Sequence, residues 1–571
     1  MSAASASRLG LDIGSYDQVI ALSQDNINET LQYHYDNHEE LKKFEAKLNT
    51  PTKEAIRGKI DAPQVELIDK AGADQAFYRL VFTEGFYTWW DQQKPDLDAP
   101  VDPDAPPAST QWIQKKIPLK GWKLAFYVDF AMKKMETIPD KIKEQINLPG
   151  SYGVDQLLID FGTADTVSFN WDRTELANFS DKDSQEQARD VISLFVGRWL
   201  SMIKETAGNH NILGYAVTVD KDQSQKVPQS DPSFPPTAVR PQTINYRPGG
   251  QAEKASTSDG RNAFLFTEMT GEKGPERLRG TSDLEWSGDF FYDSLGGSLV
   301  MSRRIFWEKF IKPKLHGVNS AAMHAINRVA NVLATPELAE HATWWLSDND
   351  TVGDGQWTST DGLDERYSWQ TNKYFDVEHE VDGPNHMYEY WTNTIVNHTL
   401  RPQVGTGNIY LDYSIQFATT LRCGVWGIPK DVSNFTVETK CSYSGSLGIS
   451  LKAVDSTGGL TVQAVDSDTH PSIEVNADFS GFATKVIKLI PGVADMFREQ
   501  SELNKMRDQI KGYMEESIRE AVTSAKGLED ALSGQKRFVF PGGGTFDMKS
   551  PIFNNKGDLL IGLSYRKGDL A

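Results

Sequence analysis

The chain has almost no cysteine: Cys423 and Cys441 are the two cysteines among its 571 residues. Two cysteines cannot form a disulfide framework in a chain of this length, so a reducing, cytoplasmic setting is the default expectation. A pairing of the two across neighbouring strands stays open on the sequence alone.

Long hydrophobic runs are also lacking. No segment approaches the roughly 20 apolar residues that are needed to cross a bilayer. The opening stretch, MSAASASRLGLDIGS, is small and polar and has no apolar centre, unlike a secretory signal. We therefore expect a cytoplasmic protein, with non-classical export left open.

Positive charge is scarce as well, since 59 basic residues face 79 acidic ones and the formal net charge is −20. A nucleic-acid partner needs a basic surface that can meet phosphates, so the composition excludes nucleic acid as the main partner. Attraction of the whole chain to anionic membranes is disfavoured too, although a local basic patch remains compatible with this charge.

Catalytic motifs are missing. The stretch PGGGTF has the glycines of a phosphate loop but not its lysine. The stretch EHEVDGPNH contains His379 and His386, which are metal-ligand residue types, but its spacing matches no zinc motif and favours a charged loop. We expect no cofactor and no catalytic residue; a metal-assisted enzyme based on these two histidines is kept as a second alternative.

The remaining composition is that of a folded protein, with 39% hydrophobic and 11% aromatic residues, and the length predicts two or three domains. Shifts in composition divide the chain into four regions. These are an N-terminal α+β region (1–220), a disordered or mobile insertion (221–262), a strand–helix middle region (263–366) and a β-meander followed by a long helix and closing strands (367–571).

Periodicity predicts an α+β fold with curved, mostly antiparallel sheets and long amphipathic helices. The stretch GWKLAFYVDFAMKKM alternates apolar and other residues, which is typical of a half-buried strand. Several stretches after residue 366 alternate in the same way between glycine-bearing turns. Apolar residues at helical spacing follow, including Met506, Ile510, Met514 and Ile518.

The segment SYDQVIALSQDNINETLQYHY changes pattern at Ser23. The residues before it predict a short strand, and after it the apolar positions Ile27, Leu31 and Tyr35 follow a helical step of four. A strand therefore passes directly into an amphipathic helix. The stretch GGSLVMSRRIFWEKFIKPKL repeats this arrangement, with Ser302 as the expected helix cap before Phe306 and Phe310.

These two segments, together with the closing FVFPGGGTFDMKSPIFNNKGDLLIGLSY, resemble the bacterial OrfX-type toxin-cluster proteins of the tubular lipid-binding superfamily. The resemblance implies a long helix wrapped by a curved antiparallel sheet, an apolar lumen and lipid binding without catalysis. The insertion in the 220s to 260s and the loop from Asp91 to Thr110 depart from the expected pattern.

The resulting prediction is non-catalytic binding of a lipid or another elongated apolar ligand in a groove between helix and sheet. Burial of an acyl chain is worth about 0.8 kcal/mol per methylene group. The expected partner is a lipid or apolar small molecule, with a protein or a membrane surface as a further partner. The residues expected to line the groove are Ile27, Leu31, Tyr35, Phe306, Phe310, Met506, Ile510, Met514 and Ile518.

The first alternative is an interaction or structural component of a toxin-like complex, in which side chains fill the same fold. A contiguous exposed aromatic patch would favour this alternative. The candidate residues for such a patch are Trp344, Trp345, Tyr388, Tyr390 and Trp391.

Overall fold

The structure is a computed structural model, and most of what it describes is strand. It describes residues 3–68, 75–92, 112–136, 152–160, 169–205, 212–219, 234, 236–247, 256, 259–291, 295–312, 356–360, 362–379, 386–425, 435–454, 459–478, 538–539 and 546–565.

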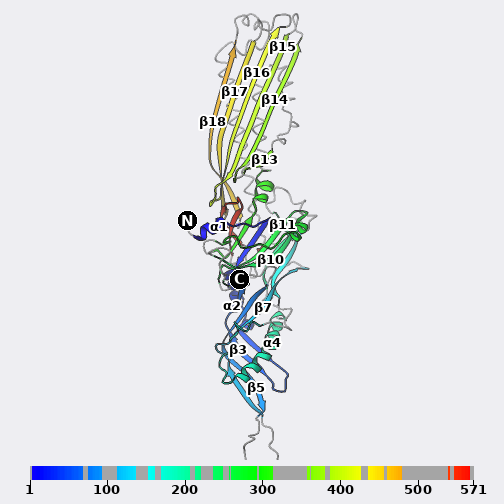
Figure 1. Cartoon of the computed structure of the whole chain (residues 1–571), viewed down its shortest axis with the longest axis vertical. Coiled ribbons are helices and arrows are strands. Elements are labelled where there is room, and N and C mark those ends of the chain that lie inside the picture. Colours follow the sequence, from blue (N-terminus) through cyan, green and yellow to red (C-terminus); the bar gives the residue numbers. More distant parts are fainter. Residues whose placement is uncertain are drawn as a thin grey trace, which may run out of the picture.

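Three sheets follow one another along the long axis of the molecule (Figure 1). The lower sheet has the order β19-β9-β8-β7-β5-β3-β2, with β4 and β6 also paired to β5. Its strands are β2 (Lys43–Lys47), β3 (Ala55–Ile60), β4 (Gln64–Leu67), β5 (Gln75–Gln92), β6 (Trp112–Pro118), β7 (Lys123–Lys134), β8 (Tyr152–Asp160), β9 (Ile212–Val219) and β19 (Phe538–Val539).

The middle and upper sheets have six strands each. The middle sheet contains, in spatial order, β10 (Pro236–Ile244), β11 (Ala263–Thr270), β1 (Gln18–Ser23), β12 (Gly297–Met301), β21 (Leu559–Tyr565) and β20 (Phe546–Phe553). The upper sheet is a meander of β13 (Gln356–Ser359), β14 (Glu365–His379), β15 (His386–Pro402), β16 (Asn408–Val425), β17 (Phe435–Val454) and β18 (Gly459–Asp478).

Helices are few in the described part of the chain. Every strand ladder there is antiparallel, so the expected α+β class with mostly antiparallel sheets is confirmed at this coarse level. The described helices are α1 (Ala3–Leu9), α2 (Gln24–Asn37), η1 (Glu39–Lys42), α4 (Lys182–Glu205), α6 (Gly274–Arg279) and η3 (Arg304–Ile311).

The predicted change from strand to helix at Ser23 is confirmed. The Ser23 hydroxyl accepts a hydrogen bond from the Asn26 amide at 3.1 Å, which satisfies one of the free N–H groups at the start of α2. The strand before it, β1, lies between β11 and β12 in the middle sheet. Because Ile20 faces one apolar cluster and Val19 the other, both faces of β1 are buried.

Residues far apart in the sequence meet in the middle sheet. Strand β12 pairs on one side with β1, near the start of the chain, and on the other with the C-terminal strand β21, so segments from the start, the middle and the end of the chain form one sheet. Residues 236–244 lie inside the segment that we expected to be a mobile insertion, yet they form β10, paired to β11. Pro236 and Pro241 argue against a strand in sequence, but an edge strand tolerates them because one side of it needs no ladder hydrogen bonds.

Aromatic side chains fill the inner face of the lower sheet. Phe44 stacks on Trp199 of α4 with ring centres 5.2 Å apart and meets Phe82 edge to face. The Trp199 indole donates a hydrogen bond to the Lys43 carbonyl oxygen at 2.9 Å. Helix α4 thus closes this face of the sheet with its own side chains.

The two cysteines lie on adjacent strands but are not partners. Cys441 is opposite Phe417, and Cys423 is opposite Phe435. The six positions between Phe417 and Cys423 correspond to about 20 Å along the strand. A disulfide requires Cα atoms within about 7 Å, so this register does not allow the pair to form one.

Candidate functional site

The groove residues predicted on α2 lie in an apolar core. Ile27 and Leu31 are buried in a cluster that continues into the lower sheet. Tyr35 packs against the same cluster, and its hydroxyl donates a hydrogen bond to the Ile60 carbonyl oxygen at 2.9 Å. The helical step of four therefore does place these three residues on the inward face of α2.

Phe306 joins this cluster from η3, a helical segment whose turns are wider than those of an α-helix. It is fully buried, and its ring centre lies 5.6 Å from that of Phe553 in β20. The neighbouring Trp307 stacks on the same Phe553 ring, with ring centres 5.6 Å apart, and donates a hydrogen bond to the Gly557 carbonyl oxygen at 3.1 Å. Phe310 belongs to η3, and its side chain lies outside the described part.

The structure thus brings Ile27, Leu31 and Phe306 into one continuous apolar cluster, with Tyr35 at its edge. The cluster connects α2, the lower sheet, one face of the middle sheet and the base of the upper sheet. The other predicted groove residues, Met506, Ile510, Met514 and Ile518, lie outside the described residues. Contact of any of these residues with a ligand stays a prediction.

One face of the upper sheet is buried where the sheet joins the body. Along β15, Val396, His398 and Leu400 are buried, whereas Asn397 and Arg401 are exposed. This is the alternation of a strand with one apolar and one polar face.

The strand register extends this division far beyond the base. Directly paired residues share a face, and the ladders β14–β15, β15–β16 and β16–β17 have no bulge. The face that includes Leu400 also carries, nearer the far end of the strands, the paired row Phe375, Tyr390, Leu421, Val437 and Ala477. We call this the apolar face of the upper sheet.

The adjacent row lies on the opposite face and has the opposite character. It consists of Asp376, Glu389, Arg422, Thr436 and Asp478, again as direct register partners. A sheet whose register puts charged residues on one face and aromatic and aliphatic residues on the other favours a cover over its apolar face, because contact of apolar side chains with water is costly.

A histidine lies at the buried base of the apolar face. The ring of His398 stacks on Tyr367 with centres 5.7 Å apart, and neither ring nitrogen has a hydrogen-bond partner among the described residues. Burial lowers the pKa of His398 to about 4, so the ring is neutral at pH 7. A neutral imidazole in this position is compatible with an apolar site.

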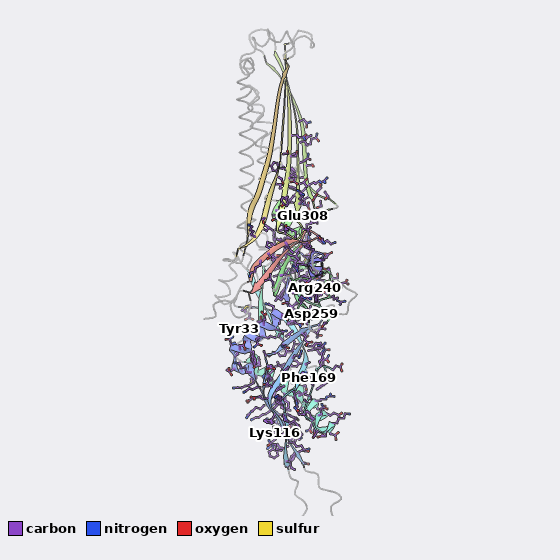
Figure 2. All side chains as sticks on the ribbon, turned by 90° about the vertical axis from the view of Figure 1, so that its left-hand side faces the viewer. Tyr33, Lys116, Phe169, Arg240, Asp259 and Glu308 are labelled. Atoms are coloured by element: carbon purple, nitrogen blue, oxygen red, sulfur yellow. The ribbon has the colours of Figure 1, made fainter. Side chains whose placement is uncertain are left out.

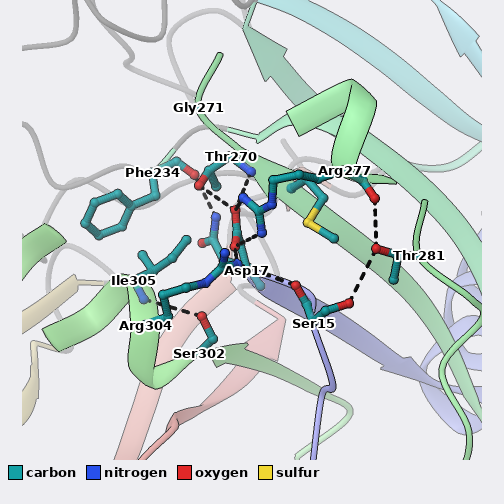
Figure 3. Close-up of polar contacts among 12 residues, drawn as sticks. Ser15, Asp17, Phe234, Thr270, Gly271, Arg277, Thr281, Ser302, Arg304 and Ile305 are labelled. Carbon is teal, nitrogen blue, oxygen red and sulfur yellow. Dashed lines mark hydrogen bonds and ion pairs between the residues drawn. The ribbon is translucent and has the colours of Figure 1, made fainter. Parts of the chain in front are cut away.

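A polar centre lies at the start of β1, where Figure 3 shows Asp17 surrounded by donors. Arg277 of α6 binds both carboxylate oxygens, at 2.6 and 2.9 Å, and Arg304 at the start of η3 contacts Oδ1. The Thr270 amide and hydroxyl both donate to Oδ2 at 2.8 Å. Because every lone-pair direction of Asp17 is engaged, this carboxylate holds α6 and η3 on the middle sheet and is no free base or nucleophile.

A second carboxylate connects η3 to the upper sheet. Glu365 at the start of β14 accepts hydrogen bonds from Arg303 at 2.8 Å and from Ser359 at 2.9 Å, and its carboxylate lies 2.9 Å from the Lys312 ammonium. Burial by itself raises the pKa of Glu365, but the hydrogen bond and charge of Lys312, with help from Ser359 and Arg303, make the net shift downward. The glutamate therefore stays ionised and ties the upper sheet to the body.

The residues of the alternative hypotheses fall mostly in the upper sheet. His379 and His386 are direct register partners at the far end of β14 and β15. No group of three potential metal ligands occurs in the part of the chain that the structure describes, and these two side chains lie outside it. A metal site there stays a prediction.

The predicted aromatic patch is divided by the register. Tyr388 and Tyr390 lie on the apolar face, whereas Trp391 lies on the opposite face because neighbouring residues alternate. Trp344 and Trp345 lie outside the described residues.

Sequence reasoning missed Asp17 and Glu365. The signals were present but weak: an aspartate directly before the apolar strand QVIAL, and the adjacent arginines Arg303 and Arg304 at the start of a predicted helix. Their partners are as distant as 287 positions along the chain, so no local pattern could pair them.

No family model and no curated protein matches the chain. Solved structures with a similar overall path include P47 of Clostridium botulinum E1 (10% identity, TM-score 0.42, covering 96% of this chain and 99% of that one). P47 from Clostridium botulinum A2 gives 11% identity and a TM-score of 0.44, covering 96% and 97%. A lipopolysaccharide binding protein gives 8% identity and a TM-score of 0.31, covering 97% and 99%.

None of the helices in the described ranges is long and apolar enough to span a membrane.

Proposed function

We propose that the protein is a non-catalytic binder of a lipid or another elongated apolar molecule, and that the ligand lies against the apolar face of the upper sheet. The observation that carries this proposal is the paired row Phe375, Tyr390, Leu421, Val437 and Ala477, backed by a charged row on the other face. An acyl chain gains about 0.8 kcal/mol for each methylene group that such a face removes from water.

The path of the chain supports a helix as the other wall of the groove. Strand β18 ends at Asp478, opposite Thr436 at the far end of the sheet, and the chain pairs again at Phe538 in the lower sheet. A strand of 20 residues is about 65 Å long. A helix covers that distance in about 43 residues, fewer than the segment 479–537 supplies.

The amphipathic stripe of this segment has the right chemistry for the inner wall. Met506, Ile510, Met514 and Ile518 follow steps of four, and one helix face would therefore present them together. Methionine side chains adapt to irregular apolar partners, which suits a flexible acyl chain. A groove between this helix and the apolar face is the arrangement that we propose.

A second candidate is a protein-interaction component with a core filled by its own side chains. The observation that favours it is the burial of Ile27, Leu31 and Phe306 among other side chains of the described cluster. The two candidates differ in the upper sheet, where a filled core leaves no room for a ligand.

Adjacent residues on β16 provide a matched pair of variants that tests the groove. Leu421→Glu places a charge on the apolar face, and Thr420→Glu places the same charge on the polar face one residue away. We expect Leu421→Glu to lower uptake of a fluorescent fatty acid at least tenfold because a carboxylate is not solvated in an acyl-chain groove. Thr420→Glu is expected to bind as the parent protein does.

The uncharged variant Leu421→Trp separates loss of the groove from loss of the fold. It fills space without burying a charge, so it should reduce uptake while thermal unfolding remains cooperative. Unchanged fatty-acid uptake by both Leu421 variants, each cooperatively folded, would overturn the proposed site. Absence of uptake by the parent protein would favour the filled core.

A further inference from the structure

The lower sheet has a solvent-exposed face that differs from the rest of this acidic chain. Tyr87 and Trp89 of β5 are buried on the side covered by α4, where Tyr87 meets Phe195 edge to face. Phe86 and Trp90 alternate with them and therefore lie on the other side. We call this other side of β2, β3, β5 and β6 the outer face.

Large aromatic side chains on the outer face are exposed. Phe86 is 43% exposed and Trp112 is 42% exposed, and both belong to the small set of large hydrophobic residues with this much exposure among the described residues. The register places Trp112 opposite Gln92, Gln114 opposite Trp90, and Pro118 opposite Phe86. Trp112, Trp90 and Phe86 thus run along one face of the β5–β6 ribbon.

Basic side chains surround these aromatic residues. The Lys116 ammonium nitrogen lies 3.3 Å from the centre of the Phe86 ring, which is a cation–π contact. Five basic and two acidic residues occupy the part of the outer face formed by β2, β3, β6 and residues 84–92 of β5, so this part carries an excess of positive charge although the chain has a net charge of −20. They are Lys43, Lys47, Arg57, Lys59 and Lys116, with Glu45 and Glu84.

The acidic residues neutralise only part of this set. Arg57 pairs with Glu45 at 3.5 Å, and Lys59 pairs with Glu84 at 2.6 Å. For Lys43, Lys47 and Lys116, no carboxylate lies within ion-pair distance in the described part of the chain. Three exposed cations are therefore available to an anionic partner.

The position of this face suits an extended flat partner. Figures 1 and 2 show that β5 and Lys116 lie near the end of the molecule opposite the upper sheet. Strand β6 is exposed along nearly its whole length, and β5 is its one partner among the described strands. An end-on contact keeps the remaining negative charge of the chain away from the partner.

We propose that the outer face of the lower sheet binds the surface of a membrane that contains anionic lipids. Lysine ammonium groups would meet lipid phosphates and carboxylates, while Trp112, Trp90 and Phe86 would enter the interfacial region that tryptophan side chains favour. Exposed tryptophan beside lysines that have no carboxylate partner among the described residues favours a membrane over an acidic protein, since a purely electrostatic contact needs no exposed apolar rings. This site is separate from the proposed acyl-chain groove.

Vesicle co-sedimentation of the full chain tests this assignment. We expect binding at low salt to phosphatidylcholine vesicles that contain phosphatidylserine, much weaker binding to pure phosphatidylcholine, and loss of binding as salt screens the contact. The double variant Lys47→Glu/Lys116→Glu should weaken binding at least about tenfold, because each lysine near an anionic surface contributes roughly fivefold. Trp112→Ala should weaken it severalfold.

Matched controls lie elsewhere on the surface. Lys452→Glu changes an exposed lysine of the upper sheet, and Trp171→Ala removes a tryptophan that is 39% exposed outside the outer face. Both should bind vesicles as the parent protein does. Equal losses in Lys452→Glu and in the double variant would overturn the assignment, because net charge and not this face would then govern binding.

Two further outcomes would also overturn it: no binding to phosphatidylserine vesicles at low salt, or binding to polyglutamate but not to vesicles, which would indicate an acidic protein partner. Fatty-acid uptake, measured on the same variants, keeps the two proposals apart. Fatty-acid uptake should not change in the outer-face variants. Conversely, Leu421→Glu, which disrupts the proposed groove, should leave vesicle binding intact.

Discussion

The lower and upper sheets show the same alternation of apolar and polar residues, but they differ in what covers their apolar faces. In the lower sheet, α4 covers the inner face, and rings such as Phe44 and Trp199 are in contact. In the upper sheet, strands of 15 to 20 residues continue the apolar face far beyond its buried base. The 24 residues of α4 are enough to cover the inner face of the lower sheet, whereas the far part of the apolar face of the upper sheet needs another cover or a ligand.

The largest loss of stability is expected in the lower sheet, whose inner face is covered by α4. Phe44→Ala removes a fully buried ring that touches both Trp199 and Phe82, so we expect a loss of about 3–5 kcal/mol in unfolding free energy. Denaturant titration of the parent protein and the variant measures this loss. Leu194→Ala on α4, a residue that is 51% exposed, should change stability by less than about 0.5 kcal/mol.

Asp17→Ala should cause the next largest loss of stability. It leaves Arg277 and Arg304 without their shared carboxylate and removes the acceptor of the Thr270 hydrogen bonds. Because both arginines are partly exposed to water, we expect a loss of about 2–4 kcal/mol, somewhat below that for a fully buried pair. A change below about 0.5 kcal/mol would contradict the role of Asp17 as the clamp of α6 and η3.

The base of the upper sheet should respond to acid through His398. Its pKa falls from an ordinary value of 6.5 to about 4 in the folded protein, so only the unfolded state takes up the proton between these values. The stability is therefore complete above pH 6.5 and is lost as the pH falls towards 4, by up to about 3 kcal/mol. His398→Phe, which retains a ring beside Tyr367, should remove this part of the pH dependence in thermal unfolding.

Glu365→Gln tests the joint between the upper sheet and the body. The amide can still accept hydrogen bonds but loses the charge that faces Arg303 and Lys312, so we expect a loss of about 1–2 kcal/mol. Faster hydrogen exchange in β13 and the start of β14 should accompany it. Exchange that changes equally in the lower sheet would show a global effect and contradict a local joint.

The small effect of a substitution in the proposed groove is best measured against the buried base of the same strand. Leu411 and Leu421 share one face of β16, but Leu411 belongs to the buried base. We expect Leu411→Ala to cost about 2–5 kcal/mol and Leu421→Ala, in ligand-free protein, less than about 1 kcal/mol. Equal losses would mean that side chains fill the whole length of the upper sheet.

The sequence was sufficient for features that depend on neighbours. The cap at Ser23, the inward stripe of Ile27 and Leu31, and the antiparallel meander all follow from local spacing, and the structure has each of them. The strand β10 was missed because the penalty for Pro236 and Pro241 depends on whether the strand lies at an edge, which only the complete sheet determines.

The hydrogen-bonded centres around Asp17 and Glu365 could not be predicted for a similar reason: their partners are distant in the sequence. Asp17 resembles an ordinary residue before a strand until Arg277 and Arg304 arrive from 260 and 287 positions away. Alternation also predicts which residues share a face, but it does not determine what covers that face. The choice between a groove and a filled core therefore depends on volume, which residue patterns do not encode.

The most direct test is native mass spectrometry of the purified protein, followed by solvent extraction and lipid analysis of whatever it carries. We expect a stoichiometric lipid or other elongated apolar molecule that is lost in Leu421→Glu and retained in Thr420→Glu. Protein that carries no such molecule and takes up no fluorescent fatty acid would contradict it.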